Sequence, residues 1–295
     1  MKEGRIVKSL SGFYYVLSGD ELIECKGRGL FRKQKITPLV GDLVTVDVQE
    51  DGTGTIVEIA ERVNELVRPP VANIDQAVIV HSLVEPEFSP LLLDRFLVLI
   101  EYHEIDPLII LTKKDLMDEA NYEKIKQYMD EYRAIGYDVL TFSKDESTEE
   151  MFSEVKPFLK DQISVIAGQS GVGKSTILNA LDLSLELETG DISKSLGRGK
   201  HTTRHVELFS LAGGLIADTP GFSSLEFNEI ETEDLRFCFP EFVDIQDQCK
   251  FRACKHMKEP GCAVKAAVEE GKIPEWRYEH YQTFYEEIQS RKPRY

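Results

Sequence analysis

The chain has 295 residues, more than one hydrophobic core usually holds, so two or three domains are expected. Its formal net charge of −17 excludes a protein that coats its whole surface with nucleic acid. The sequence has no uncharged apolar run of about 18 residues, and its first residues lack the apolar segment of a signal peptide. We therefore expect a cytoplasmic protein that does not enter a membrane.

The charge is unevenly distributed along the chain. Residues 1–35 carry eight lysines and arginines against four acidic residues, a net charge of +4. Residues 192–206 carry four lysines and arginines, two histidines and no acid. These two basic islands allow contact with RNA on chosen faces, although an ordinary solvated surface can have the same composition.

The first 68 residues are predicted to form an all-β domain. Five short runs rich in β-branched and aromatic residues are separated by Ser-Gly, Ser-Gly-Asp and Asp-Gly-Thr-Gly turn signals. Five strands in so short a segment suit an OB-fold barrel that binds RNA, with protein docking as the alternative use. The basic segment 26–33 is expected to be one of its loops. The expected strands are 5–7, 13–17, 21–25, 43–48 and 54–59.

Pro69 and Pro70 mark a boundary because neither can donate a hydrogen bond to a strand ladder. Beyond them, over residues 69–228, apolar strands alternate with amphipathic helices, which indicates a parallel sheet covered on both faces. Strands are expected at 76–80, 107–112, 138–142, 163–167 and 214–217, and helices at 91–102, 122–134, 149–159 and 176–181.

Residues 168–175 fit the P-loop pattern G-x-x-x-x-G-K-[ST] between a strand and a helix. The glycines let successive backbone N–H groups turn into one concavity at a helix N-terminus, which favours phosphate. Lys174 is predicted to reach the outer phosphates, and Ser175 to ligate the Mg²⁺ that accompanies the nucleotide. The predicted phosphate-binding residues are Gly168, Gln169, Ser170, Gly171, Val172, Gly173, Lys174, Ser175 and Thr176.

A second motif, at 112–115, differs by one residue from Asn-Lys-x-Asp, the guanine-reading motif of GTPases. The carboxylate of Asp115 is predicted to accept from the N1–H and 2-amino group of guanine, with a helix cap as its alternative role. Thr112 replaces the usual Asn, so its share of the hydrogen bonding stays open. Residues 141–143 are expected to add backbone contacts to the guanine oxygen. The predicted motif residues are Thr112, Lys113, Lys114 and Asp115.

A third motif, Asp218-Thr-Pro-Gly221, follows an expected strand. Asp218 is predicted to hold a water bound to Mg²⁺, and the Gly221 N–H to meet the γ-phosphate. In the segment before it, a threonine hydroxyl is predicted to complete the metal shell once the γ-phosphate orders that segment. Thr203 is the first candidate and Thr202 the second.

The order of the motifs is rearranged relative to Ras-like domains, in which the P-loop comes first and the guanine motif last. A site built from strand ends survives such a cut of the chain. Phe222 stands where Ras-like proteins carry a water-orienting glutamine, so slow hydrolysis is predicted until a partner or another side chain assists. His201 is the candidate side chain, with a basic contact or a helix cap as the alternative. The predicted catalytic residues are thus His201, Lys174 and Thr203.

Residues 229–295 are predicted to form a mainly helical domain with a structural zinc site. Three cysteines and one histidine lie within fourteen residues, and this donor set selects Zn²⁺. Four protein ligands leave no open position for catalysis, and reduced buried cysteines are the alternative. The predicted ligands of the single zinc are Cys249, Cys254, His256 and Cys262. Cys25 and Cys238 are expected to be buried thiols, and a helix from Glu275 is expected to pack on this domain.

A barrel, a GTPase domain with rearranged motifs and this cysteine and histidine pattern, in that order, resemble the bacterial RsgA (YjeQ, YloQ) family of circularly permuted GTPases over the whole chain. The resemblance implies binding to the 30S ribosomal subunit and its 16S rRNA late in maturation, GTP hydrolysis stimulated by the subunit, and release afterwards. It also implies that His201 matters for the stimulated hydrolysis and that the residues named above bind guanine, phosphate and zinc.

We expect the chain to be a monomer. Two other functions stay open at this point. One is a regulatory GTP switch that acts on a protein partner, with the barrel as a docking module and no RNA contact. The other is a P-loop ATPase, which requires that Asp115 does not select guanine.

Overall fold

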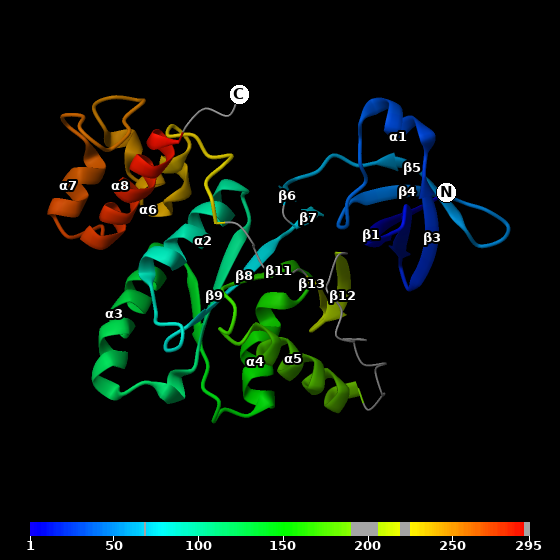
Figure 1. Ribbon diagram of the computed structural model, residues 1–295, viewed down its shortest axis with the longest axis horizontal. Coiled ribbons are helices and arrows are strands. Elements are labelled where there is room, and N and C mark those ends of the chain that lie inside the picture. The colour runs from blue at the N-terminus through cyan, green and yellow to red at the C-terminus, as the bar shows by residue number, and fades with distance from the viewer. Residues whose placement is uncertain (68, 190–205, 219–224, 292–295) are drawn as a thin grey trace.

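The computed structural model describes residues 1–67, 69–189, 206–218 and 225–291. Figure 1 shows three bodies: a barrel drawn in blue, a central sheet with helices on both faces, and a group of helices drawn in yellow to red. The predicted sequence of all-β barrel, α/β domain and helical domain is confirmed.

The barrel holds five strands in the order β1-β2-β3-β5-β4, and β4 also pairs with β1. This closure pairs the edges that an open five-stranded sheet would expose. Ile6, Val16, Val46 and Ile56 are fully buried inside it. The predicted strands are confirmed and extend slightly at their ends: β1 Lys2–Leu10, β2 Phe13–Ser18, β3 Glu21–Gly27, β4 Leu43–Val48 and β5 Gly54–Ile59.

The basic segment at 26–33 is predicted to be a loop, and this prediction is wrong in part. Residues Gly29–Gln34 form a short helix, α1, between β3 and β4. Phe31 is buried in the core, and its carbonyl accepts a hydrogen bond from the backbone N–H of Ile36. Burial of one aromatic ring thus fixes a turn of helix in a stretch whose glycines indicated a loop.

The central sheet is parallel except for its last strand. Its order is β10-β9-β8-β11-β13-β12, in which only β12 runs antiparallel to its neighbour β13. β12 was not predicted. A separate hairpin of β6 and β7 precedes the sheet, so the boundary expected after residue 68 lies within that hairpin. The strands are β6 Glu65–Val67, β7 Pro70–Ala72, β8 Gln76–Ser82, β9 Asp106–Thr112, β10 Asp138–Thr141, β11 Ile163–Ala167, β12 Glu207–Leu211 and β13 Gly214–Asp218.

Helices cover both faces of this sheet, so its strands are buried on both sides. Every residue of β8 is buried: Ala77 and Ile79 join one core with α2 and α3, while Val78 and Val80 join a second core with α4 and α5. Such strands read as continuous apolar runs, which is why the sequence indicated a parallel sheet. The helices are α2 Pro90–Tyr102, α3 Glu119–Ile135, α4 Thr148–Leu159 and α5 Lys174–Thr189.

The barrel is joined to the edge of the central sheet. β1 pairs antiparallel with β12 at Lys8 and Glu207, and the ammonium of Lys8 lies 2.9 Å from the carboxylate of Glu207. The barrel therefore contacts the edge strand of the α/β domain at the first residue of β12.

The C-terminal domain packs around an aromatic core. Phe239, Phe242, Tyr281 and Phe284 are fully buried, and the ring centroids of Phe239 and Phe242 lie 5.0 Å apart. Among the described residues, no helix is long and apolar enough to span a membrane. The elements are η2 Leu235–Cys238, α6 Pro240–Val243, η3 Gln246–Gln248, α7 Ala263–Glu269 and α8 Glu275–Ser290.

Candidate functional site

The P-loop leaves the buried strand β11 at Gly168 and enters α5 at Lys174. Gly168, Gly171 and Gly173 have φ values of 140°, 81° and 100°, which side chains rarely adopt. A Cβ on Gly168 would also lie 2.1 Å from the Val80 carbonyl oxygen of the neighbouring strand. Glycine is therefore required at the start of the loop by both conformation and space.

The ammonium of Lys174 folds back over this loop. It donates to the carbonyl oxygens of Gly168 at 2.7 Å and Gln169 at 2.6 Å. Burial lowers the pKa of Lys174, so its charge is partly desolvated in this arrangement. A phosphate placed in the loop would supply the counter-charge that the ammonium lacks.

Ser175 and Thr176 are exposed in the first turn of α5, while Ile177 and Leu178 anchor the helix in the core. These two residues thus lie at a helix N-terminus, where the helix dipole favours an anion such as phosphate. The residues that we predicted to bind phosphate thus form the turn 168–173 at the carboxyl end of β11 and the first turn of α5.

Thr112 links the guanine motif to the P-loop. Its hydroxyl donates to the carbonyl oxygen of Val172 at 2.6 Å, and its side chain is buried. A Cβ on Gly173 would lie 3.7 Å from the Thr112 side chain. In this structure the Thr112 hydroxyl is therefore bonded to the P-loop. The sequence, in which Thr replaces the usual Asn, did not indicate this role.

The other residues of the guanine motif differ in their surroundings. The exposed Asp115 carboxylate accepts from the backbone N–H of Lys144 at 2.9 Å, which ties the motif to the segment after β10. Lys113 has a left-handed backbone with φ of 61°, and its ammonium donates to the Glu85 carbonyl oxygen. The Lys114 ammonium instead lies 5.0 Å from the centroid of the Tyr122 ring.

Parallel strands bring the three motifs to one edge of the sheet. β9 ends at Thr112, β11 ends at the P-loop, and β13 ends at Asp218, with β8 between β9 and β11. Ligands of open α/β sheets bind at such carboxyl ends. Although the chain order differs from the Ras order, the ends of β9, β11 and β13 lie along the same edge of the sheet. The remaining predicted residues, His201, Thr202, Thr203 and Gly221, lie outside the described part of the chain.

The four predicted metal ligands converge on one point. Their sulfur and nitrogen atoms all lie within 4.8 Å of one another. Nδ1 of His256 lies 3.3 Å from Sγ of Cys262 and 3.7 Å from Sγ of Cys249. The sulfurs of Cys249 and Cys262 accept from the backbone N–H groups of Ala263 and Lys265.

These donors fit a metal with nitrogen and sulfur ligands. Burial lowers the pKa of His256 to about 4, which keeps its imidazole neutral, as a ligand must be. Burial raises the pKa of Cys254 to about 12, so the thiol releases its proton only when a cation binds. The cluster can hold a metal ion with four protein donors and no open position.

The other two cysteines lie outside the cluster. Cys25 and Cys238 are both buried and free, as we had expected. Burial raises the pKa of Cys25 to about 11 and raises that of Cys238 as well, so neither is a reactive thiolate at neutral pH.

A buried arginine joins the C-terminal domain to the α/β domain. Arg277 of α8 is fully buried, and Nε and Nη2 donate to Glu241 at 2.8 and 3.1 Å. Its Nη1 also forms an ion pair with Asp94 of α2 at 2.6 Å. Tyr132 of α3 and His280 of α8 contact the same Asp94 carboxylate at 2.6 Å each.

The sequence reasoning missed this network. Arg277 lies at helical spacing from Tyr281, Phe284 and Ile288, which form the buried face of α8. The available signal was a cation on the apolar face of a helix. Its two carboxylate partners could not be identified from the sequence because they lie 36 and 183 residues away along the chain.

Comparison with known proteins fits this geometry. The model of the RsgA GTPase matches residues 59–228, and that of the RsgA N-terminal domain matches residues 3–56. The small ribosomal subunit biogenesis GTPase RsgA of Bacillus cereus (strain ATCC 10987) is 59% identical over 295 residues, and that of Bacillus subtilis (strain 168) is 56% identical over 301 residues, each covering both chains fully.

Two solved structures are similar over nearly their whole lengths. The circularly permuted GTPase YloQ gives a TM-score of 0.86 at 50% identity and covers 100% of this chain and 97% of that one. YjeQ from Thermotoga maritima gives a TM-score of 0.85 at 38% identity, with 99% of each chain covered. With its barrel, its permuted motifs and its four-donor cluster, this chain belongs to the RsgA GTPase family and hydrolyses GTP.

Proposed function

We propose that this GTPase binds the 30S ribosomal subunit and assists its late maturation, with hydrolysis stimulated by the subunit and coupled to release. The observation that carries the proposal is the full-length identity of 59% with a relative named as a small ribosomal subunit biogenesis GTPase. Identity that covers the barrel, the GTPase domain and the metal-bearing domain together supports a shared partner, not only a shared reaction.

The barrel, within residues 1–68, is proposed to contact 16S rRNA. Its described cations include Lys26, whose ammonium lies 5.2 Å from the centroid of the Phe13 ring, and Arg28. A cation beside an aromatic ring on a barrel suits an RNA backbone with an unpaired base. Because the whole chain carries −17 charges, the contact is confined to such islands.

The two cofactors are proposed as Mg²⁺ with GTP and one structural Zn²⁺ per chain. Ser175 and Asp218 are the proposed protein partners of Mg²⁺, with Thr203 ahead of Thr202 as the residue that completes its shell. The cluster Cys249, Cys254, His256 and Cys262 is the proposed zinc site in the domain of residues 229–295. Its soft donors and lack of an open position support zinc in a structural role.

In the GTPase domain of residues 69–228, Lys174 is proposed to stabilise charge on the transferred phosphoryl group, and His201 to support the stimulated reaction. The His201→Ala variant should keep nearly normal GTP affinity and lose the stimulated turnover. A stimulated rate equal to that of the unchanged chain would refute that role. Hydrolysis without the subunit should be slow because Phe222 cannot orient water.

Co-sedimentation tests the partner directly. The chain, as a cytoplasmic monomer, should sediment with purified 30S subunits in the presence of a non-hydrolysable GTP analogue and dissociate with GDP. Failure to bind the subunit in either state would favour the alternative, a regulatory switch that acts on a protein without RNA contact. The Asp115→Asn variant separates GTP from ATP specificity, because it should weaken GTP binding far more than ATP binding.

A further inference from the structure

A pocket of about 630 Å³ lies next to the guanine motif, between the loop Leu83–Pro90 and the first turns of α3. Pockets that hold ligands or anchoring side chains are usually about 300 to 1,000 Å³. Leu83 is buried at its base, and Phe88, Ile125 and Tyr128 are partly buried in its walls, where they pack against the main core. The apolar walls of the pocket are therefore continuous with the main core.

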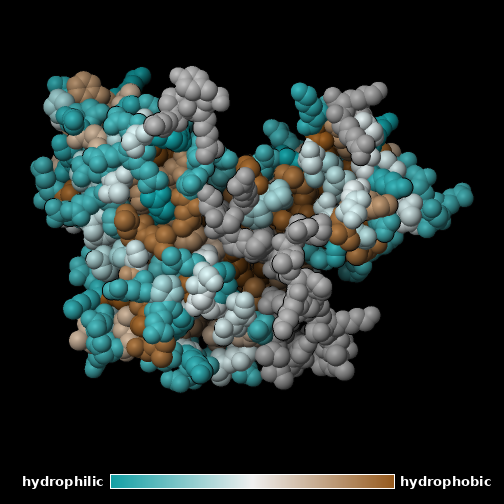
Figure 2. Space-filling model, in the orientation of Figure 1, coloured by the Kyte–Doolittle hydropathy of each residue, from teal (hydrophilic) through white to brown (hydrophobic). Residues whose placement is uncertain are grey.

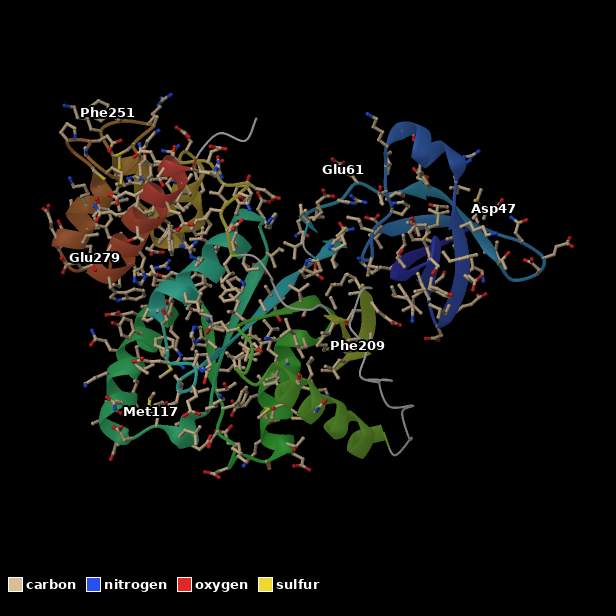
Figure 3. The ribbon with its side chains drawn as sticks, viewed as in Figure 1. Asp47, Glu61, Met117, Phe209, Phe251 and Glu279 are labelled. Carbon is tan, nitrogen blue, oxygen red and sulfur yellow. The ribbon has the colours of Figure 1, made fainter. Side chains whose placement is uncertain are left out.

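The mouth of the pocket is apolar on one side and open to solvent. Leu116 lines it with 55% of its surface exposed, and Met117 lies beside it. Figure 3 labels Met117 on the lower left flank of the molecule, and Figure 2 shows hydrophobic surface in that area. An apolar side chain of a partner can thus enter from solvent without displacing any part of the fold.

The charged residues that line the pocket are mostly acidic. Glu85, Glu87 and Asp118 are exposed around it, and Lys124 is the one cation among the described residues that line it. Hydrogen bonds from backbone N–H groups, led by that of Asn121, lower the pKa of Asp118, so this carboxylate stays charged at neutral pH. An acidic rim repels phosphate groups, which disfavours RNA or a nucleotide as the occupant.

We propose that this pocket binds a basic segment of a protein partner. An apolar side chain of the segment would insert between Phe88 and Ile125, and its lysines or arginines would face Glu85, Glu87 and Asp118. This combination of one buried apolar anchor and a complementary charged rim is how small docking sites reach specificity. The site goes beyond the proposed function because it uses none of the nucleotide, RNA or metal residues.

The position of the pocket connects it to both neighbouring sites. The Lys113 ammonium of the guanine motif donates to the Glu85 carbonyl oxygen in the pocket loop. On the other wall, the ring of Tyr128 lies 5.1 Å, centroid to centroid, from Trp276 of α8 in the metal-bearing domain. A bound segment therefore contacts structure that is bonded to the guanine motif and packed against the third domain.

The first test measures binding of designed peptides to the full-length chain by fluorescence anisotropy. The probe is a labelled nine-residue peptide with one central leucine among lysines and glycines. Two comparison peptides replace the leucine by alanine, or the lysines by glutamates. We expect the leucine and lysine peptide to bind at least about tenfold more tightly than either comparison, a difference of about 1.4 kcal/mol. Equal binding of the leucine and alanine peptides would overturn the proposal.

Two variants locate the binding on the surface. Glu87→Lys reverses an exposed rim charge without touching the core, so the variant should fold normally. It should bind the basic peptide about tenfold more weakly. The matched control is Glu123→Lys, the same charge change on α3 at a residue that is not among the pocket-lining residues and forms an exposed ion pair with Lys126. If both variants weaken peptide binding equally, the binding is nonspecific attraction to an acidic chain, and the proposal is wrong.

The second test identifies the natural partner and rests on the proposed function. A photo-crosslinking amino acid at position 87 is irradiated in the complex with 30S subunits, with position 123 as the control. Crosslinks to a ribosomal protein from position 87 alone support the pocket, whereas crosslinks to rRNA overturn it. If the chain does not co-sediment with the subunits at all, the proposed function fails, and the peptide measurement decides the pocket by itself.

Discussion

The hydroxyl of Thr112 donates a 2.6 Å hydrogen bond to the carbonyl oxygen of Val172, and so joins the guanine motif to the P-loop. Val172 is fully buried, so no water replaces the donor when the hydroxyl is removed. The residue that departs from the usual guanine motif therefore positions the phosphate-binding loop.

The first prediction is that Thr112→Val weakens the binding of GTP and of GDP alike, by about tenfold, because the P-loop loses the buried hydrogen bond that positions it at Val172. Loss of such a bond costs about 1 to 3 kcal/mol. The preference for guanine over adenine nucleotides should be unchanged. Thr112→Ser keeps the hydroxyl and serves as the control with near-normal affinity. Titration with fluorescent guanine and adenine nucleotides checks both quantities, and a selective loss of guanine preference would instead assign Thr112 to base recognition.

The second prediction concerns the buried ion network between the domains. Arg277→Met removes the cation that pairs with Asp94 and Glu241, and it leaves both carboxylates buried. We expect a loss of about 3 kcal/mol in the free energy of unfolding, measured with urea. Lys126→Met breaks an exposed ion pair and should cost less than about 1 kcal/mol. A small effect of Arg277→Met would mean that the network does not stabilise the interface.

The third prediction is a pH dependence from Glu101 of α2. Burial raises the pKa of this carboxyl from 4.5 to about 7. Between pH 4.5 and about 7 the Glu101 carboxyl keeps its proton in the folded chain and loses it in the unfolded chain. The free energy of unfolding therefore falls as the pH rises through this range. Glu101→Gln removes this ionisation. The substitution should therefore be more favourable for the free energy of unfolding at pH 8 than at pH 5, by about 2 kcal/mol. Identical effects at the two pH values would contradict the raised pKa.

The fourth prediction is that removing the proposed zinc opens the cysteine loop and leaves the α/β domain intact. Backbone N–H groups of Ala263 and Lys265 donate to cluster sulfurs, so hydrogen exchange should accelerate there after chelation. α8 should stay protected because Arg277 holds it to α2. Cys254→Ala should abolish binding of one zinc per chain, whereas Cys238→Ala, outside the cluster, should keep it. Unchanged exchange after complete metal removal would argue against a structural site.

The sequence indicated most of the fold because its signals are local. The glycines of the P-loop, the turn signals of the barrel and the apolar runs of the parallel strands depend on neighbours within a few residues. The signals failed at α1, where Phe31 is buried in the core although the glycines of the segment indicated a loop. They also missed β12, which forms a hairpin with β13 through Ala212 and Gly213.

The candidate site divides in the same way. The sequence by itself determined the donor set Cys249, Cys254, His256 and Cys262, the P-loop and the permuted order of the motifs, since each is a spacing of residue types along the chain. Only the tertiary structure decided that Thr112 contacts Val172, that Arg277 pairs with Asp94, and that an acidic pocket lies beside the guanine motif. Thr112 and Val172 are 60 positions apart, Arg277 and Asp94 are 183 apart, and the pocket joins residues between 83 and 128. Packing of the whole fold is what brings them together.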